Sequence, residues 1–262
     1  MDLIQHFDSL HAFAGFMVGV LVGLTGVGGG SLMTPILVLL FNQPAQTAVG
    51  TDLLFAAVTK MAGSAVHGWK ATVDWRIMRL LATGSIPAAL VTVSIIQYFG
   101  KIGKSTEHVI LLVLGVMLVL TAIATLFQKR LVRFAGEHND LRLRQARVPT
   151  ILLGAVIGVL VSVSSVGAGA IGVTALLMLY PRLPVSRIVG TDIAHAVPLA
   201  LVAGTGHWLI GAVNLPLLLA LLIGSLPGVV IGSLLSTRAP DHYLRPALAA
   251  VLTFAGLKLL TQ

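Results

Sequence analysis

The stretch ThrGlyValGlyGlyGly, residues 25–30, interrupts an apolar region that would otherwise read as a single transmembrane segment. Apolar pieces flank this stretch at 13–24 and 31–41. As helices rising 1.5 Å per residue, the two pieces would each reach about 17 Å, roughly half of a hydrocarbon core of about 30 Å. We therefore expect one broken crossing, a re-entrant hairpin, or two short crossings.

The rest of the chain has the composition of a protein that lies in a lipid bilayer. Hydrophobic residues make up 56% of the 262 residues and charged residues 10%, which is outside the usual range of soluble domains. Apolar segments at 45–67, 76–99 and 108–127 are each long enough to cross a bilayer. Asp2 and Asp8 stand where a cleaved leader would carry Lys or Arg, so we expect no leader.

The chain also repeats itself at a shift of 140 residues. ValGlyThrAsp at 49–52 returns at 189–192, and GlySerIlePro at 84–87 returns as GlySerLeuPro at 224–227. We expect an all-α, polytopic membrane protein of two repeats, each a broken or re-entrant helix pair followed by three transmembrane helices. The predicted parts are a first repeat at 1–127, a basic cytoplasmic linker at 128–149, and a second repeat at 150–262 that is broken at 164–170 and crosses at 185–207, 215–235 and 245–260.

The distribution of basic residues favours repeats of inverted topology. If the broken element is a hairpin or crosses twice, three basic residues at 70–79, six in the linker and four at 182–245 face the cytoplasm, which leaves three outside. If the element crosses once, the repeats are parallel, and ten basic residues face the cytoplasm against six outside, compared with thirteen against three for the inverted repeats. Cytoplasmic loops carry the excess of Lys and Arg. We therefore predict inverted repeats and a bacterial inner membrane as the location.

Several other classes of protein are excluded. The net charge of +8 does not indicate a nucleic-acid partner, because all of the 17 Lys and Arg except Lys60 lie in or beside segments that join apolar runs. The absence of cysteine excludes disulfides and thiolate metal sites. Neither His-Glu-x-x-His nor Gly-x-Ser-x-Gly occurs. We expect no enzymatic activity, no metal and no cofactor.

A series of motifs resembles the sulfite exporter TauE/SafE family of bacterial membrane proteins. The motifs are GlyValGlyGlyGlySerLeuMetThrProIleLeu at 26–37, AlaValGlyThrAspLeuLeu at 48–54, HisGlyTrpLysAlaThrValAspTrp at 67–75 and GlySerIlePro at 84–87. The resemblance covers nearly the whole chain and implies an anion permease. Sulfite, thiosulfate, sulfoacetate and related organosulfur anions are among the substrates that the family implies. The second copy departs from the pattern, since Ala175 replaces Pro35.

The glycine-rich interruptions are candidate parts of a substrate site. Broken helices are tolerated at membrane depth only where the freed backbone groups face protein or a wet cavity. A helix that starts there would direct unpaired N–H groups and its positive dipole end at an anion. Close helix packing by small residues is the alternative explanation. The residues predicted to line the site are Gly28, Gly29, Gly30, Ser31, Gly167 and Gly169.

Three ionisable residues lie inside predicted crossings, namely Asp52, Lys60 and Asp192. Each would cost about 2.5–3.5 kcal/mol at the bilayer centre, so each needs a partner or a function. Inverted repeats would place Lys60 at the depth of Asp192, and we predict that the two face each other across the interface between repeats. His195, one turn after Asp192, is a candidate to share its proton. A purely structural ion pair, and local capping by Asp52, are the alternatives.

Two further pairs of residues recur in the repeats. Thr51 and Thr191 offer hydroxyls to an oxyanion, although a threonine that bonds back to its own helix is equally ordinary. His67 and His207 are predicted at helix ends near opposite membrane faces, either as gating residues or as solvated end residues.

The sequence thus predicts a secondary transporter that moves a small anion by alternating access, with proton coupling as an option, and the resemblance implies sulfite or an organosulfonate as the anion. A passive anion channel is the alternative, because the same glycine breaks can build a pore. The oligomeric state stays open, with a homodimer among the alternatives.

Overall fold

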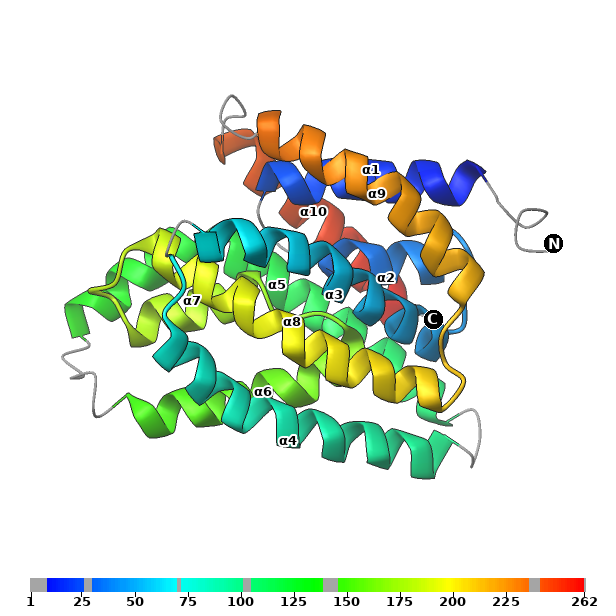
Figure 1. Cartoon of the computed structure of the whole chain (residues 1–262), viewed down its shortest axis with the longest axis horizontal. Helices are drawn as coiled ribbons and strands as arrows, with labels where there is room; N and C mark the ends of the chain where they lie inside the picture. Colours follow the sequence, from blue (N-terminus) through cyan, green and yellow to red (C-terminus); the bar gives the residue numbers. More distant parts are fainter. Residues whose placement is uncertain are drawn as a thin grey trace.

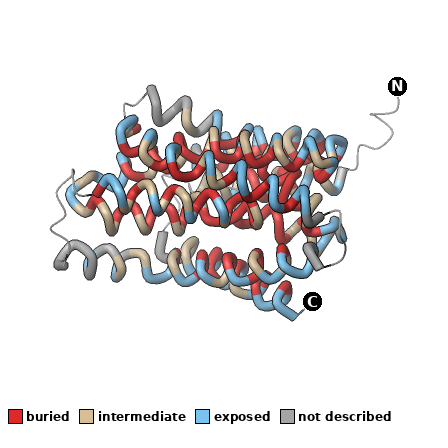
Figure 2. Tube along the Cα trace, turned by 90° about the horizontal axis from the view of Figure 1, so that it is seen from below, coloured by how far each residue is buried: buried red, intermediate tan, exposed pale blue. Residues whose placement is uncertain are grey.

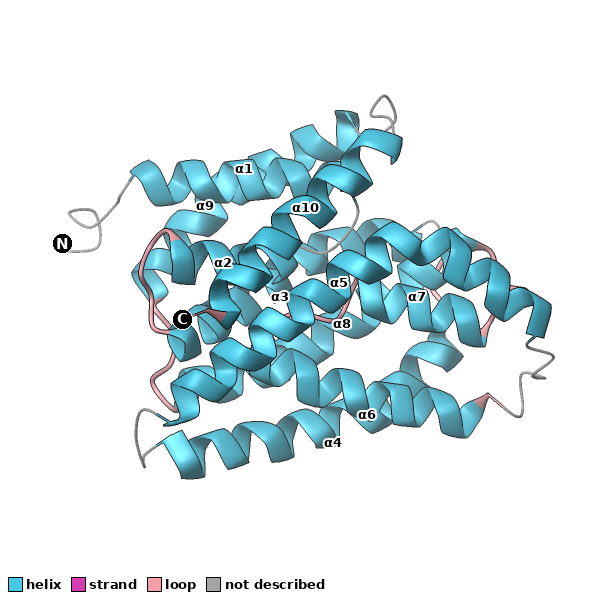
Figure 3. Ribbon diagram, turned by 180° about the vertical axis from the view of Figure 1, so that it is seen from behind, coloured by secondary structure: helices cyan, strands magenta, loops and turns pink. Residues whose placement is uncertain are grey.

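The computed structural model describes residues 9–25, 30–69, 72–100, 105–138, 146–235 and 241–261, and the elements in this part of the chain are helices joined by loops (Figure 1, Figure 3). The first half contains α1 Ser9–Thr25, α2 Gly30–Leu39, α3 Ala45–Trp69, α4 Trp75–Gly100 and α5 Ser105–His138. The second half contains α6 Arg147–Ser164, α7 Ala170–Leu179, α8 Val185–Leu209, α9 Leu215–Leu235 and α10 Asp241–Leu260.

Five helices in the described part are long and apolar enough to cross a membrane: α4, α5, α6, α8 and α9. The prediction of a polytopic all-α protein is confirmed. The first piece of the second broken element is longer than expected, because α6 has 18 residues and reaches crossing length, whereas α7 has 10. Helix α5 continues to His138, so the first part of the predicted linker is helical. Its residues there include good helix formers such as Gln, Lys, Arg and Leu.

The two halves pack into each other rather than side by side as separate bundles. Helices α3 and α8 lie together in the centre of the molecule (Figure 1). Helix α1 of the first half packs on α9 of the second, and α6 of the second half packs on α4 of the first. These two outer pairs lie on opposite sides of the central helices (Figure 1). Each half therefore depends on the other for its packing.

The same close contact occurs twice in these outer pairs. A Cβ atom at Gly19 of α1 would collide with the backbone of Ser225 in α9, and a Cβ atom at Gly158 of α6 would collide with the backbone of Ser85 in α4. Ser85 and Ser225 occupy equivalent positions in the repeated GlySer motif. Both helix pairs approach so closely because glycine stands at the contact.

The equivalent central helices run in opposite directions. Along α3 and α8, Gly204 packs against Leu54, and Gly50 packs against His207. The contacts move forward along one helix as they move backward along the other, which is the pattern of an antiparallel pair. Buried residues face the inside of the molecule (Figure 2), and α8 is the most buried of the five helices of crossing length.

Candidate functional site

The second break, between the end of α6 at Ser164 and the start of α7 at Ala170, is built from residues in left-handed conformations. Gly167 and Gly169 have φ angles of 122° and 135°, and Ser165 has φ 58°. Only glycine adopts such angles without strain. The Ser164 hydroxyl accepts a hydrogen bond from the Val166 N–H at 3.2 Å and so holds the turn. Backbone bonding resumes where Gly172 N–H donates to the Gly167 carbonyl at 3.0 Å.

Lys60 joins the first half of the chain to this break. Its ammonium group donates to the carbonyl oxygen of Ala168 at 3.2 Å, and the residue is buried, with 8% of its surface exposed. Carbonyl groups freed by an interrupted helix need donors, and the lysine supplies one. Lys60 also lies within electrostatic range of both Asp192 and Asp52.

Asp192 is buried with 1% of its surface exposed. Among the described residues, neither of its carboxylate oxygens has a hydrogen-bond partner. The carboxylate lies against Gly172 in the first turn of α7, so closely that a Cβ atom at Gly172 would collide with it. Lys60 lies within electrostatic range of Asp192, but its direct bond is to the break, so the pairing of the two side chains stays a prediction.

Asp52 occupies a different environment. The hydroxyl of Thr34 in α2 donates to one of its oxygens, and Ser165 of the second break lies beside it. Within the described part, the other oxygen of Asp52 and the Ser165 hydroxyl have no hydrogen-bond partner. Asp52 therefore holds α2 against α3 rather than capping its own helix, which begins seven residues earlier at Ala45.

The sequence did not identify Thr34 or Ser165. The recurrence of Thr34 as Thr174 was a usable signal, although the Thr174 hydroxyl bonds only to the Ala170 carbonyl of its own helix, at 2.6 Å. Ser165 lies within the stretch that was identified as the second break.

In the described part of the chain no hydrogen bond joins His195 to Asp192, and the predicted sharing of a proton stays a prediction. Its Nε2 atom forms a hydrogen bond with the hydroxyl of Ser85 in α4 at 2.8 Å. Its Nδ1 atom has no partner in the described part. One turn of helix separates His195 from Asp192 along α8, but the ring bonds toward α4, which packs against α8. The recurrence of the GlySer motif at Ser85 was the signal that could have pointed to this pair.

His207 lies two residues before the end of α8 at Leu209 and is fully buried, so it is not a solvated end residue. Its Nε2 atom bonds to the carbonyl oxygen of Ser162 in α6 at 2.9 Å, and Gly50 packs against its Cβ atom. The absence of a side chain at Gly50 admits the histidine between the helices. The side chain of His67, its counterpart in the first half, lies outside the described residues.

Thr51 and Thr191 are engaged in matching contacts between the halves. Thr51 accepts a hydrogen bond from the Asn214 N–H, just before α9, at 3.0 Å. Thr191 accepts one from the Asp74 N–H, just before α4, at 2.8 Å. An ion pair lies beside the second contact, between Asp74 and Arg187 at 3.7 Å. Both hydroxyls thus connect helix ends.

Gly28 and Gly29 lie outside the described residues, and Gly30 begins α2. Ser31 follows as a buried residue. The structure therefore brings together the second break, Lys60, Asp52 and Asp192, and the hydrogen bond from Thr34 to Asp52 joins the helix that follows the first break to them.

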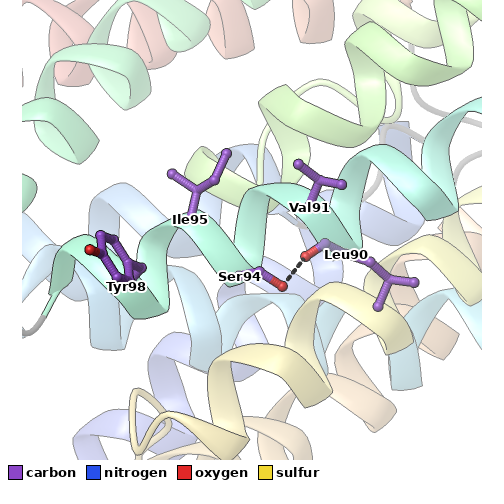
Figure 4. A pocket seen from close by; sticks show the side chains of 5 residues that line it. All are labelled: Leu90, Val91, Ser94, Ile95 and Tyr98. Atoms are coloured by element: carbon purple, nitrogen blue, oxygen red, sulfur yellow. Dashed lines mark hydrogen bonds between the residues drawn. The ribbon is translucent and has the colours of Figure 1, made fainter.

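Two hollows lie away from this cluster. One, of about 370 Å³, is formed by side chains of α4 alone, and Figure 4 shows its lining residues Leu90, Val91, Ser94, Ile95 and Tyr98. Its Ser94 hydroxyl is already bonded to the Leu90 carbonyl at 2.8 Å, and none of the residues that line it carries a positive charge. The other, of about 280 Å³, lies near the Thr51 contact and is lined by His11, Gln43, Asn214, Pro216, Leu217 and Ala220.

Comparison with known proteins identifies the family of the chain. The model of the family described as "Sulfite exporter TauE/SafE" matches residues 11–259. The chain belongs to the sulfite exporter TauE/SafE family. It is 40% identical over 249 residues to the probable membrane transporter protein YjnA of Bacillus subtilis (strain 168), covering 94% of this chain and 97% of that protein.

Other TauE/SafE relatives are more distant. The probable membrane transporter protein YdhB of the same organism is 28% identical, with 94% and 97% coverage. A probable membrane transporter protein of Methanocaldococcus jannaschii is 24% identical, with 94% and 92% coverage. No solved structure matches the chain. The TauE/SafE chain is a multi-pass membrane protein of a family of transporters, not of enzymes, and a bacterial inner membrane is consistent with this assignment.

Proposed function

We propose that this TauE/SafE protein is a secondary transporter that moves a small anion, most simply sulfite or an organosulfonate, by alternating access. The observation that carries the proposal is Lys60, a buried cation whose ammonium lies on the second break. A buried charge inside a crossing is costly and usually functional. A cation beside freed backbone groups is the chemistry that a small oxyanion needs.

Inverted repeats at 1–127 and 150–262, joined by the linker, are part of the proposal. The antiparallel course of α3 and α8 supports them, because repeats related by an axis along the membrane normal would have parallel equivalents. The recurrence of the α1–α9 contact as α6–α4 also supports them. In such transporters the substrate lies near the midplane where the broken helices meet, and one repeat moves against the other.

The buried groups have separate roles in this proposal. Lys60 and the backbone of the second break, at Gly167 and Gly169, attract the anion, and the unpaired hydroxyl of Ser165 donates to it. Asp192 takes up the coupling proton. His195 lies one turn further along α8, held by its hydrogen bond with Ser85, and assists Asp192. The first break, Gly28 to Ser31, supplies the facing part of the site, and Asp52 gates it through Thr34.

The remaining candidates act at the ends of the crossings. Thr51, Thr191 and His207 are proposed as gating residues, because each bonds to a backbone group of the other half or of a neighbouring helix. The gating role of His67 stays a prediction. Assembly into a homodimer is a separate alternative that also stays open.

Flux into proteoliposomes tests the proposal. Purified protein should move sulfite, sulfate, thiosulfate or a small sulfonate, and transport of a cation or neutral solute in their place would refute an anion carrier.

Lys60→Met should lower the anion flux at least about tenfold, because the buried cation is lost. Lys258→Met removes the same charge from an exposed position near the end of α10 and should leave flux unchanged. Flux that is independent of any ion gradient and too fast for a carrier would favour the channel.

A further inference from the structure

The second half places a carboxylate at the position where an anion would bind. Asp192 lies against Gly172, the third residue of α7. The N–H group of Gly172 itself donates to the Gly167 carbonyl at 3.0 Å, but the dipole of the helix favours negative charge at its start. Neither oxygen of Asp192 has a hydrogen-bond partner in the described part, although the residue is 1% exposed. The carboxylate is thus buried at the helix start, and in the described part no hydrogen bond holds it there.

In the described part of the chain, one cation, Lys60, lies near this carboxylate. The Lys60 ammonium bonds to the Ala168 carbonyl, two residues before α7 begins, and is within electrostatic range of Asp192. The other ionisable groups that face this place are Asp52 on α3 and His195 on α8. Helix α7 itself contains no ionisable side chain. One cation therefore faces Asp192, and an incoming anion would be a second negative charge competing for it.

We propose that Asp192 is an internal competitor of the substrate: its carboxylate occupies the anion position at the start of α7, and the anion enters only when Asp192 takes up a proton. Each binding event then consumes one proton, and the proton leaves again when the anion leaves on the other side. No covalent step is involved. This mechanism rests on the proposed anion transport and specifies how the transport is coupled.

The first half does not share this arrangement. The residue at the position equivalent to Gly172 is Leu32, whose side chain would fill the space next to the helix. Asp52 instead accepts a hydrogen bond from Thr34. The competitor role therefore belongs to Asp192 alone, and the two aspartates of the repeated ValGlyThrAsp motif are expected to differ in function.

The test measures anion uptake by the full-length protein in proteoliposomes at several pH values, with sulfate and methanesulfonate as probes because both keep their charge between about pH 5 and pH 8. The wild-type apparent affinity should weaken by up to about tenfold per pH unit as the pH rises, as expected for one linked proton. Asp192→Asn should bind the anion without this dependence. It should also retain anion exchange and lose accumulation driven by a proton gradient.

Asp52→Asn is the matched comparison, since it removes the other buried carboxylate of the repeated motif and should keep the pH dependence. If Asp192→Asn keeps that dependence and still accumulates anion, the competitor role is wrong. If Asp52→Asn loses it as well, the assignment to Asp192 alone is wrong. If the wild-type protein moves no anion at all, the proposed function itself fails, so the two failures are distinguishable.

Gly172→Ala offers a second route if Asp192→Asn does not fold. The added methyl group would displace the carboxylate from the start of α7, which removes the dipole that favours its charged form. Anion affinity should then persist to a higher pH than in the wild-type protein. The proposal is overturned if the pH at which anion affinity falls is unchanged or lower in Gly172→Ala than in the wild-type protein.

Discussion

At the scale of single residues, Ser165 combines two unfavourable features. Its φ angle of 58° is in the left-handed region, which costs a non-glycine residue roughly 1–2 kcal/mol, and its buried hydroxyl has no partner in the described part. Such strain is often retained where a site requires it. We expect Ser165→Gly to increase the free energy of unfolding by about 1 kcal/mol, and so to raise the melting temperature. We also expect it to lower the anion flux.

The control for Ser165 is Asn42→Gly. Asn42 is the other non-glycine residue with positive φ in the described part, at 48°, and it lies in the exposed turn after α2. Its replacement should stabilise the protein slightly, since asparagine tolerates this conformation better than serine, and leave flux unchanged. Full flux in Ser165→Gly would show that the hydroxyl does not contact the anion.

The threonines of the repeated motif make a second residue-scale prediction. Thr51→Val and Thr191→Val each remove the acceptor of an N–H group at the start of a helix in the other half. The loss should be about 1 kcal/mol each, or roughly 2–4 °C in melting temperature. Thr59→Val is the control, because the Thr59 hydroxyl bonds only to carbonyls of its own helix. Equal effects of all three variants would contradict a role in joining the halves.

The charged members of the cluster could be predicted from the sequence, and their partners could not. Asp52, Lys60 and Asp192 are conspicuous as ionisable residues within apolar segments. The bonds from His195 to Ser85 and from His207 to the Ser162 carbonyl join residues 110 and 45 positions apart. Such pairs depend on which helices pack together and on how each side chain points, neither of which a periodicity of apolar residues determines.

At the scale of helices, glycine decides how closely the two halves approach. A Cβ atom at Gly15 would collide with the backbone of Leu221, and a Cβ atom at Gly154 with that of Leu81. Gly15→Val and Gly154→Val should therefore force α1 from α9 and α6 from α4, with a loss of about 1–3 kcal/mol each from overpacking. Thermal unfolding in detergent measures both.

A substitution on the outer surface controls for added bulk in these helices. Val91→Leu enlarges a side chain of α4 that is 59% exposed, so it should leave stability unchanged. Because the two glycine contacts are equivalent in the repeats, similar losses at Gly15 and Gly154 are expected. A large loss at only one of them would show that the two outer pairs are not equivalent.

The positions of the helices were largely predictable, and the exact shape of the broken elements was not. The uninterrupted apolar segments at 185–207 and 215–235 match α8 and α9 within a few residues. Helix α6 starts at Arg147, earlier than its apolar segment, because the bilayer boundary rather than the helix boundary sets where apolar residues begin. Likewise α5 continues past its apolar segment into the basic residues that follow.

At the scale of the whole molecule, the inverted arrangement predicts where each helix end lies, and the absence of cysteine makes it directly measurable. Inverted repeats place Trp75 and Val185, the first residues of α4 and α8, on the cytoplasmic side and Leu209 outside. Single cysteines at these exposed positions are labelled with a membrane-impermeant maleimide in intact cells. We expect labelling of Leu209→Cys only, with the other two reacting after permeabilisation.

Parallel repeats would instead expose Val185→Cys and protect Leu209→Cys. Trp75→Cys would stay protected under both arrangements and so controls for leakage. Labelling of Val185→Cys in intact cells would therefore remove the inverted arrangement, and with it the meeting of the two breaks on which alternating access depends.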